Sequence, residues 1–216
     1  MTVRPDLGDG TYRHDAAGPA TCHRYLLPAV LHELQAICAT NGNARQLMDL
    51  GCGSGYVADW LCARGFQVTG VEPSVSGVTH ARAAYPDLDI HSGSAYEDLA
   101  GRFGRFPTVI SLEVVEHLFD PRRFARNLFE LLEPRGYAII STPYHGYLKN
   151  LAIALVDASD KHFAPLWDGG HIKFWSVRTL SALMAEAGFE VVRFRRVGRI
   201  PPLANSMIAV LRKPRQ

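Results

Sequence analysis

Two acids and a histidine stand close together in the middle of the chain. Glu113, Glu116 and His117 follow a run of apolar residues in the segment Leu112-Glu113-Val114-Val115-Glu116-His117. If a helical turn begins at Glu113, the three side chains share one face, because residues three and four apart are neighbours on a helix. Two carboxylates and an imidazole suit Mg²⁺ or Mn²⁺ better than structural zinc, which commonly takes thiolates. The segment therefore predicts a site for a divalent cation.

A fourth ligand must come from elsewhere in the chain, and His171 is the best candidate. It lies in Gly169-Gly170-His171-Ile172-Lys173-Phe174-Trp175, just before a predicted helix. The two glycines allow this loop to fold back over the site, and the helix anchors it. His145 and His162 are substitutes from the same region.

The same residues also have plainer interpretations. One acid could contact a cofactor or solvent while the other pairs with Arg122 or Arg123. His117 could be the general base of a metal-free enzyme, since imidazole titrates near neutral pH, or a hydrogen-bonded neighbour of the ligands. The residue types alone leave these alternatives open.

A second motif with chemical meaning is Asp49-Leu50-Gly51-Cys52-Gly53-Ser54-Gly55. An apolar run ends in an acid, glycines follow at alternate positions, and amphipathic sequence then resumes. This pattern predicts a buried strand, a tight turn and the start of a helix, where backbone N–H groups and the helix dipole hold a ligand. Glu72 closes the next predicted strand about 20 residues later, where an acid accepts hydrogen bonds from ribose hydroxyls.

These motifs stand at strand ends in a regular alternation of strands and helices. The 216 residues suit one domain with a buried core. Alternating strands and helices imply a parallel sheet. After the glycine strand, we expect strands at 66–72, 88–93, 108–112 and 137–141, then a hairpin of 190–197 and 206–211. We expect helices from 21 to about 37, and at 56–63, 74–84, 121–132, 148–156 and 176–187.

The glycine motif, Glu72, the strand into Leu112-Glu113 and the terminal strand pair together resemble class I S-adenosylmethionine-dependent methyltransferases. The resemblance covers residues 21–213 and implies one domain with a Rossmann-like α/β fold. Its mostly parallel seven-stranded sheet would carry a C-terminal antiparallel hairpin and helices on both faces. Residues 1–20 are expected to form a flexible arm, and 143–175 a lid on the substrate side.

The resemblance also implies where S-adenosylmethionine binds. Asp49 and Gly51 would lie by its amino-acid part, Glu72 would hold the ribose, and Ser94-Ala95-Tyr96 would flank the adenine. Ser94 stands where the family usually has an acid. The expected cofactor-binding residues are Asp49, Gly51, Cys52, Gly53, Gly55, Glu72, Pro73, Ser94, Ala95, Tyr96, Leu112 and Glu113.

The E-x-x-E-H motif with a later histidine resembles two groups of methyltransferases. One is the ubiquinone-biosynthesis O-methyltransferases, and the other is the Hen-type small-RNA 2′-O-methyltransferases. Both methylate an oxygen beside another oxygen, which a cation can chelate and activate. We therefore expect O-methylation of a small phenol, catechol or quinol, with Glu113, Glu116, His117 and His171 holding Mg²⁺ or Mn²⁺. Glu116 and His117 are the expected catalytic residues.

Other functions stay open alongside this one. They are metal-independent N- or C-methylation with His117 as base, RNA 2′-O-methylation, and cofactor binding without catalysis. Six aromatic residues could form an acceptor pocket or fill the lid's own core. They are Tyr144, Tyr147, Phe163, Trp167, Phe174 and Trp175.

Composition favours a small-molecule partner. The 23 Lys and Arg nearly balance 21 Asp and Glu, so nucleic acid is not expected as a partner. Arg193 and Arg195 share a strand face that is interpreted as a solvated edge. Four scattered cysteines without a C-x-x-C pair suit reduced thiols in the cytoplasm. No run reaches the ~20 apolar residues of a membrane span, although Leu148–Val156 could touch a membrane. The oligomeric state stays open.

Overall fold

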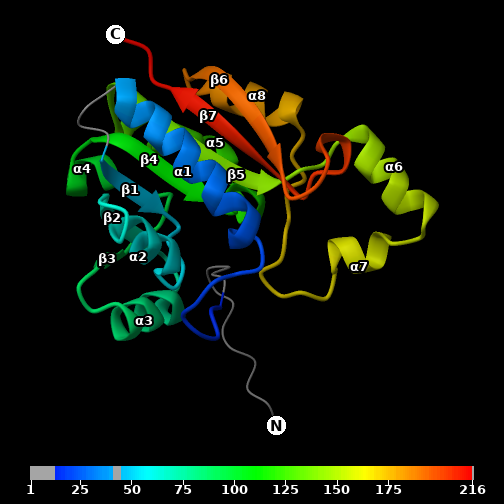
Figure 1. The fold of residues 1–216 in the computed structure, drawn as a ribbon, viewed down its shortest axis with the longest axis horizontal. Helices are drawn as coiled ribbons and strands as arrows, with labels where there is room; N and C mark the ends of the chain where they lie inside the picture. Colours follow the sequence, from blue (N-terminus) through cyan, green and yellow to red (C-terminus); the bar gives the residue numbers. More distant parts are fainter. Residues whose placement is uncertain (1–12, 41–44, 216) are drawn as a thin grey trace.

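The computed structural model describes residues 13–40 and 45–215. Its centre is a seven-stranded sheet in the order β3-β2-β1-β4-β5-β7-β6 (Figure 1). The strands are β1 (Gln46–Leu50), β2 (Gln67–Glu72), β3 (Asp89–Ser92), β4 (Phe106–Leu112), β5 (Leu132–Pro143), β6 (Glu190–Val197) and β7 (Ser206–Arg212). The first five strands pair in parallel, while β7 runs antiparallel between β5 and β6. The predicted mostly parallel sheet with a C-terminal antiparallel pair is confirmed.

Helices connect the strands. They are α1 (His23–Thr40), α2 (Tyr56–Cys62), α3 (Val75–Ala84), α4 (Leu99–Phe103), α5 (Pro121–Glu130), α6 (Tyr147–Leu155), α7 (Ser159–Phe163) and α8 (Val177–Glu186), with short 3₁₀ helices η1 (Val115–His117) and η2 (Pro201–Leu203). The sequence did not predict α4 and α7, because five residues give too little periodicity to detect. The longer helices lie close to their predicted positions.

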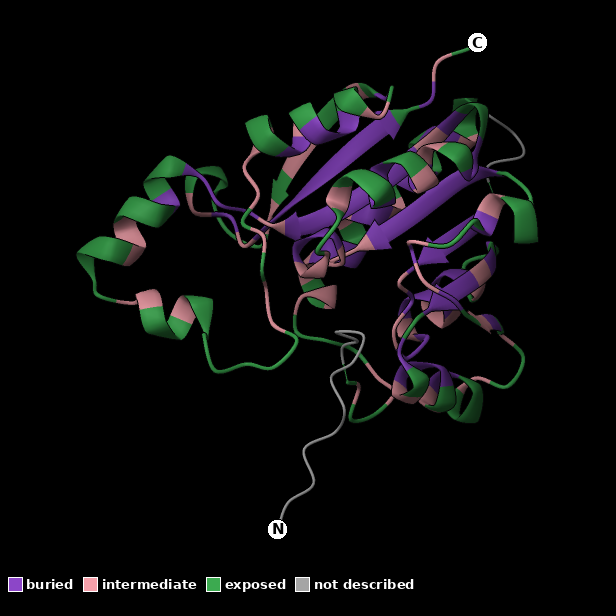
Figure 2. Ribbon diagram, turned by 180° about the vertical axis from the view of Figure 1, so that it is seen from behind, coloured by how far each residue is buried: buried purple, intermediate pink, exposed green. Residues whose placement is uncertain are grey.

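Side chains from both faces of the sheet form the core. Neighbouring strand residues point to opposite faces, so Leu47 and Ile110 pack with α1, α2 and α3, whereas Met48 and Val109 pack with α4, α5 and α8. Figure 2 shows the buried strands lying between these helices. The prediction of helices on both faces is confirmed.

Most of the segment 143–175 lies outside this core, although Tyr144 belongs to the core and Trp175 packs against it. Figure 1 shows α6 and α7 beyond the end of the sheet, and several of their apolar side chains are exposed, such as Leu155 at 77%. Among the described residues, no helix has the length and apolar character needed to cross a bilayer. The expected role of this segment as a substrate-side lid stays a prediction.

A buried acid of α1 forms ion pairs with the edge strand of the sheet. Glu33 is fully buried and forms ion pairs with Arg193 and Arg195 of β6. Alternation along β6 places both arginines on the face that α1 covers. The two arginines, which the sequence assigned to a solvated edge, are therefore paired with a buried acid of α1.

Loss of this acid is expected to destabilise the protein. In Glu33→Gln, Arg193 and Arg195 lose their anion, and a neutral amide remains buried between them. Because both arginines are partly exposed, we expect the free energy of unfolding, measured with urea, to fall by about 1–3 kcal/mol. The matched control is Glu186→Gln, which breaks the exposed 2.7 Å pair with Arg122 and should leave the free energy of unfolding nearly unchanged, because solvent screens this pair. Equal losses in the two variants would contradict a structural role for Glu33.

Candidate active site

A cavity of about 900 Å³ lies at the carboxyl ends of β1, β2 and β4. Open α/β sheets bind ligands at this edge, where the strand order reverses. Every expected cofactor-binding residue except Gly55 lines the cavity. His117 and His171 line it as well, so the expected cofactor and metal residues border one continuous space.

The glycine turn after β1 forms one wall of this cavity. Gly51, Gly53 and Gly55 have φ values of +84°, +57° and +82°, a region that other residues rarely adopt. A Cβ atom on Gly51 would lie 2.6 Å from Cγ2 of Val114, so the turn also requires close packing. Gly55 is the N-cap of α2 and packs against Ala81, which explains why it does not line the cavity.

Glu72 holds the turn in place from the end of β2. Its Oε2 accepts a hydrogen bond of 2.9 Å from the N–H of Gly53, and its Oε1 accepts one of 2.9 Å from the N–H of Ser74. Burial raises the pKa of Glu72, and these two hydrogen bonds oppose the rise. Asp49 lies beside it, and burial followed by the charge of Glu72 raises the pKa of Asp49 to about 7. The cavity therefore carries two buried acids at its glycine end.

The backbone at Glu113 differs from the sequence expectation. Glu113 has φ +55°, and the 3₁₀ helix η1 begins only at Val115. The predicted helical turn from Glu113 was therefore wrong, because a left-handed residue interrupts it. Instead of sharing a helical face with Glu116 and His117, Glu113 accepts hydrogen bonds from Ser141 Oγ at 2.8 Å and Ser206 Oγ at 3.3 Å.

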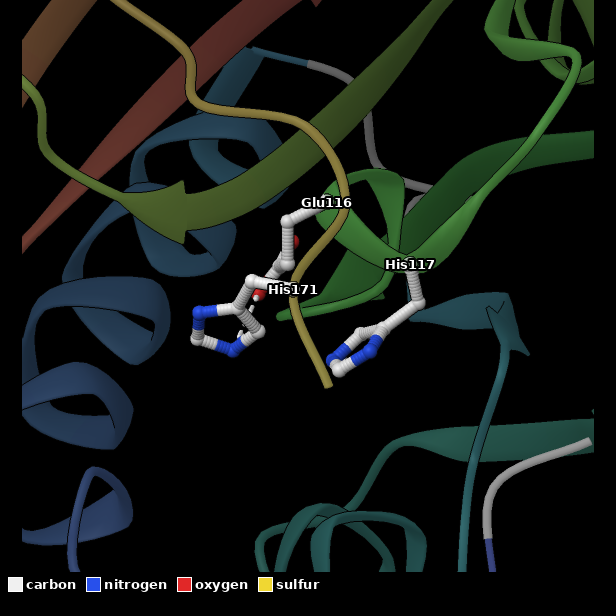
Figure 3. Close-up of side chains that lie close together, drawn as sticks. All are labelled: Glu116, His117 and His171. Atoms are coloured by element: carbon white, nitrogen blue, oxygen red, sulfur yellow. Dashed lines mark ion pairs between the residues drawn. The ribbon is translucent and has the colours of Figure 1, made fainter. Parts of the chain in front are cut away.

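Glu116, His117 and His171 do come together, as Figure 3 shows. One possible ligand atom from each residue lies within 4.8 Å of the others. Nε2 of His171 is 3.9 Å from Oε1 of Glu116, and the two imidazole centroids are 4.9 Å apart. Glu113 lies outside this group of three. The substitutes His145 and His162 lie outside it too, and their rings pack with Phe163 and Phe174.

Backbone hydrogen bonds bring the His171 loop to η1. The N–H groups of Ile172 and Lys173 both donate to the carbonyl of Glu116 at 2.9 Å. Nδ1 of His117 lies 2.8 Å from the carbonyl oxygen of Gly169. Because a carbonyl only accepts, Nδ1 carries the proton in the neutral ring and Nε2 carries the lone pair. A carbonyl partner of this kind is typical of histidines that bind metals.

The charges at this end of the cavity are poorly compensated by the protein itself. Glu116 is 1% exposed, and neither of its oxygens accepts a well-formed hydrogen bond from residues 13–40 or 45–215. Burial and then the charge of Glu113 raise the pKa of Glu116 well above its usual range. Burial lowers the pKa of His117, and burial with His117 and His162 nearby lowers the pKa of His171 to about 4. A bound divalent cation would lower the pKa of Glu116, and the resulting carboxylate with two neutral imidazoles is a donor set that fits such a cation.

Several residues at the site carried no clear signal in the sequence. Ser141 and Ser206 hold Glu113 but read as ordinary strand residues. Trp167 was considered either for an acceptor pocket or for the core of the lid, and it lines the cavity beside both imidazoles. Its ring centroid is 6.0 Å from that of His117 and 5.3 Å from that of His171.

Fold and site together define the class of the protein. A glycine turn after β1, an acid at the end of β2 and an antiparallel β7 are the features of S-adenosylmethionine-dependent methyltransferases. The chain belongs to the methyltransferase domain family, whose model matches residues 22–193.

Two relatives show the same relationship. The chain is 35% identical over 154 residues to a ubiquinone biosynthesis O-methyltransferase of Azorhizobium caulinodans, covering 68% of this chain and 59% of the relative. It is 31% identical over 147 residues to a probable S-adenosylmethionine-dependent methyltransferase of Mycolicibacterium smegmatis, covering 68% of this chain and 52% of the relative. The aligned part thus spans only about half to three-fifths of these relatives.

Solved structures show the same fold. The methyltransferase domain of bacterial-CtHen1-C superposes with a TM-score of 0.66 at 22% identity, covering 87% of this chain and 96% of that one. A methyltransferase from Mesorhizobium loti superposes with a TM-score of 0.60 at 20% identity, covering 78% of this chain and 90% of that one.

The raised pKa of Asp49 predicts a pH effect on cofactor binding. S-adenosylmethionine carries positive charge, and binding of its amino-acid part beside Asp49, as the resemblance implies, would favour the carboxylate and lower the pKa of Asp49. Binding near the free-protein pKa of about 7 should therefore release a proton. Affinity should rise with pH up to about 7 and level off above it. Calorimetry in buffers of different ionisation enthalpy measures this release, and Asp49→Asn should remove it.

Proposed function

We propose that the protein transfers the methyl group of S-adenosylmethionine to a hydroxyl oxygen of a small aromatic acceptor, assisted by a divalent cation. The acceptor is a phenol, catechol or quinol, and Glu116, His117 and His171 would hold the cation. The observation that carries the proposal is the buried acid Glu116, whose oxygens accept no well-formed hydrogen bond from the described residues and which lies beside two neutral imidazoles.

The donor set favours Mn²⁺ over Mg²⁺. Imidazole nitrogen is a softer ligand than the oxygens that Mg²⁺ prefers, and two of the three donors here are imidazoles. When bound, such a cation would lower the pKa of an acceptor hydroxyl and orient it. Glu113 lines the same cavity and would add a second negative charge near the cation.

The protein's own residues mainly position the two substrates. The glycine turn would hold the amino-acid part of the cofactor and Glu72 its ribose, and the imidazoles border the same cavity. Trp167 and Phe119 line the cavity with them and offer flat apolar walls to a planar acceptor. Alignment of the hydroxyl oxygen with the methyl group, away from water, supplies much of the rate enhancement.

A second candidate is metal-independent transfer with His117 as the general base. Its Nδ1 donates to the Gly169 carbonyl, and burial lowers its pKa, so Nε2 of a neutral ring can take a proton at neutral pH. This alternative leaves the lone carboxylate of Glu116 without a role, which is why we place it second.

The surface supports a small acceptor rather than RNA. Arg193 and Arg195 of the edge strand β6 pair with Glu33, so their charge is partly neutralised. The name of the Hen1 neighbour therefore does not decide the acceptor of this chain. We further propose that α6 contacts a membrane when the acceptor is lipophilic. The exposed apolar side chains of Leu148, Leu155 and Val156 could lie in the membrane surface. We also propose that the protein acts in the cytoplasm, where its four unbridged thiols would stay reduced.

An acceptor screen tests the proposed function. Phenols, catechols, quinols and short RNAs are incubated with methyl-labelled S-adenosylmethionine, with and without Mn²⁺. Transfer to a catechol or quinol that requires Mn²⁺ is expected. Transfer to RNA alone, or to nitrogen or carbon without a metal, would contradict the proposal.

A further inference from the structure

The segment before α1 forms a wall of the cofactor cavity. Residues 13–20 all line it, together with the glycine turn and Glu72. Figure 1 shows this segment in deep blue, running from α1 towards α3. The sequence predicts a flexible arm over residues 1–20. Residues 13–20 of this arm border the site, and residues 1–12 lie outside the described residues.

His14 makes the most specific contacts of this segment. Its backbone N–H donates to Ser76 Oγ at 3.0 Å, just inside α3. Its ring lies against Gly53 and Gly77, where an added Cβ would be 2.9 Å from Cε1 and 3.0 Å from Cδ2 respectively. A Cβ on Gly53 would displace the ring, and one on Gly77 would press on both the ring and Cγ of Glu72, so the two glycines and His14 fit one another.

The ring also borders the acid that is expected to hold the ribose. Nε2 of His14 is 3.9 Å from Oε1 of Glu72. Burial, followed by the nearby charge of His80, lowers the pKa of His14, so the ring is neutral at neutral pH. A neutral imidazole can both donate and accept a hydrogen bond, which suits a hydroxyl group better than a fixed charge does.

We propose that residues 13–20 form a strap that completes the S-adenosylmethionine site and that His14 contacts the cofactor on its ribose side. A ribose bound to Glu72 above Gly53 lies within reach of this ring. The proposal depends on the cofactor of the family and is independent of the cation and the acceptor. The strap places a binding residue outside the glycine motif and about 40 positions before it in the chain.

Calorimetry with S-adenosylmethionine and with 5′-methylthioadenosine tests this inference on the full chain. Methylthioadenosine keeps the base and ribose but lacks the amino-acid part. We expect His14→Ala to raise Kd for both ligands by about fivefold to tenfold, and His14→Gln to recover part of the loss. His91→Ala on β3, outside the cavity, is the control and should leave both affinities unchanged.

Two further results separate a ligand contact from a structural role. The melting temperature of ligand-free His14→Ala should match that of the wild type, and S-adenosylmethionine should slow hydrogen exchange in residues 13–20. Equal or tighter binding by His14→Ala would overturn the proposal, because the ring would then be dispensable or would obstruct the site. A loss confined to S-adenosylmethionine, with methylthioadenosine unaffected, would also overturn the assignment to the ribose side.

Discussion

Glu116→Gln is expected to abolish metal-dependent methyl transfer while leaving the fold intact. The substitution keeps the shape of the side chain but removes the only anionic donor in the group of three. Without it, two neutral imidazoles bind a divalent cation weakly, and we expect a fall in rate of roughly 10²- to 10³-fold. Methyl transfer at saturating S-adenosylmethionine with Mn²⁺ present measures this effect.

The stability of the same variant distinguishes loss of a ligand from loss of structure. A buried acid whose oxygens accept no well-formed hydrogen bond from the described residues costs folding free energy, and an amide of the same shape costs no more. In the presence of a chelator, Glu116→Gln should therefore melt at the same temperature as the wild type or higher. Glu133→Gln, at an exposed acid, is the control and should change neither activity nor stability. Activity within twofold of wild type in Glu116→Gln would contradict the assignment of Glu116 as a ligand.

Glu72→Gln is expected to weaken S-adenosylmethionine binding by about 100-fold. Both oxygens of Glu72 accept backbone N–H groups, from Gly53 and from Ser74. A glutamine replaces one acceptor with an N–H₂ group, which must then face another donor. The glycine turn would lose a hydrogen bond to the end of β2, and the ribose would lose a charged hydrogen-bond acceptor. Equilibrium binding of S-adenosylmethionine measures the loss.

Asp98→Asn provides the comparison for this variant. Asp98 also holds a backbone N–H, that of Gly101 at 2.9 Å, but it caps α4 and does not line the cavity. Cofactor affinity should stay within about twofold of the wild type, since loss of a helix cap acts on local stability. An equal loss of affinity in both variants would mean that the effect of Glu72→Gln comes from general destabilisation.

Local sequence patterns were sufficient to predict the part of the site that is expected to bind the cofactor. The alternate glycines require left-handed backbone, and all three adopt it after β1, as the motif predicts. Glu72 ends β2, and because parallel strands place their carboxyl ends at one edge of the sheet, it lies near the glycine turn after β1. Both signals depend on residues within one strand, turn and helix, and so both can be predicted without the tertiary structure.

The arrangement of Glu113 and its neighbours depends on contacts between residues far apart in the sequence, which no local pattern predicts. Glu113 is held in a left-handed conformation while Ser141 and Ser206 bind its carboxylate, and Ser206 lies 93 residues away in the sequence. Non-glycine residues rarely have positive φ, so a helical turn was the natural expectation there. His171 could still be proposed because its glycines signalled a loop that folds back, and the structure brings it to Glu116 and His117.

The central claim is that the transfer reaction depends on a bound cation. The most direct test is the rate of methyl transfer from S-adenosylmethionine to a catechol by protein freed of metal with a chelator, before and after Mn²⁺ is added back. We expect little transfer in the metal-free protein and recovery of at least about 100-fold with Mn²⁺. Full activity in the metal-free protein, unchanged by Mn²⁺, would show that the reaction does not need the cation.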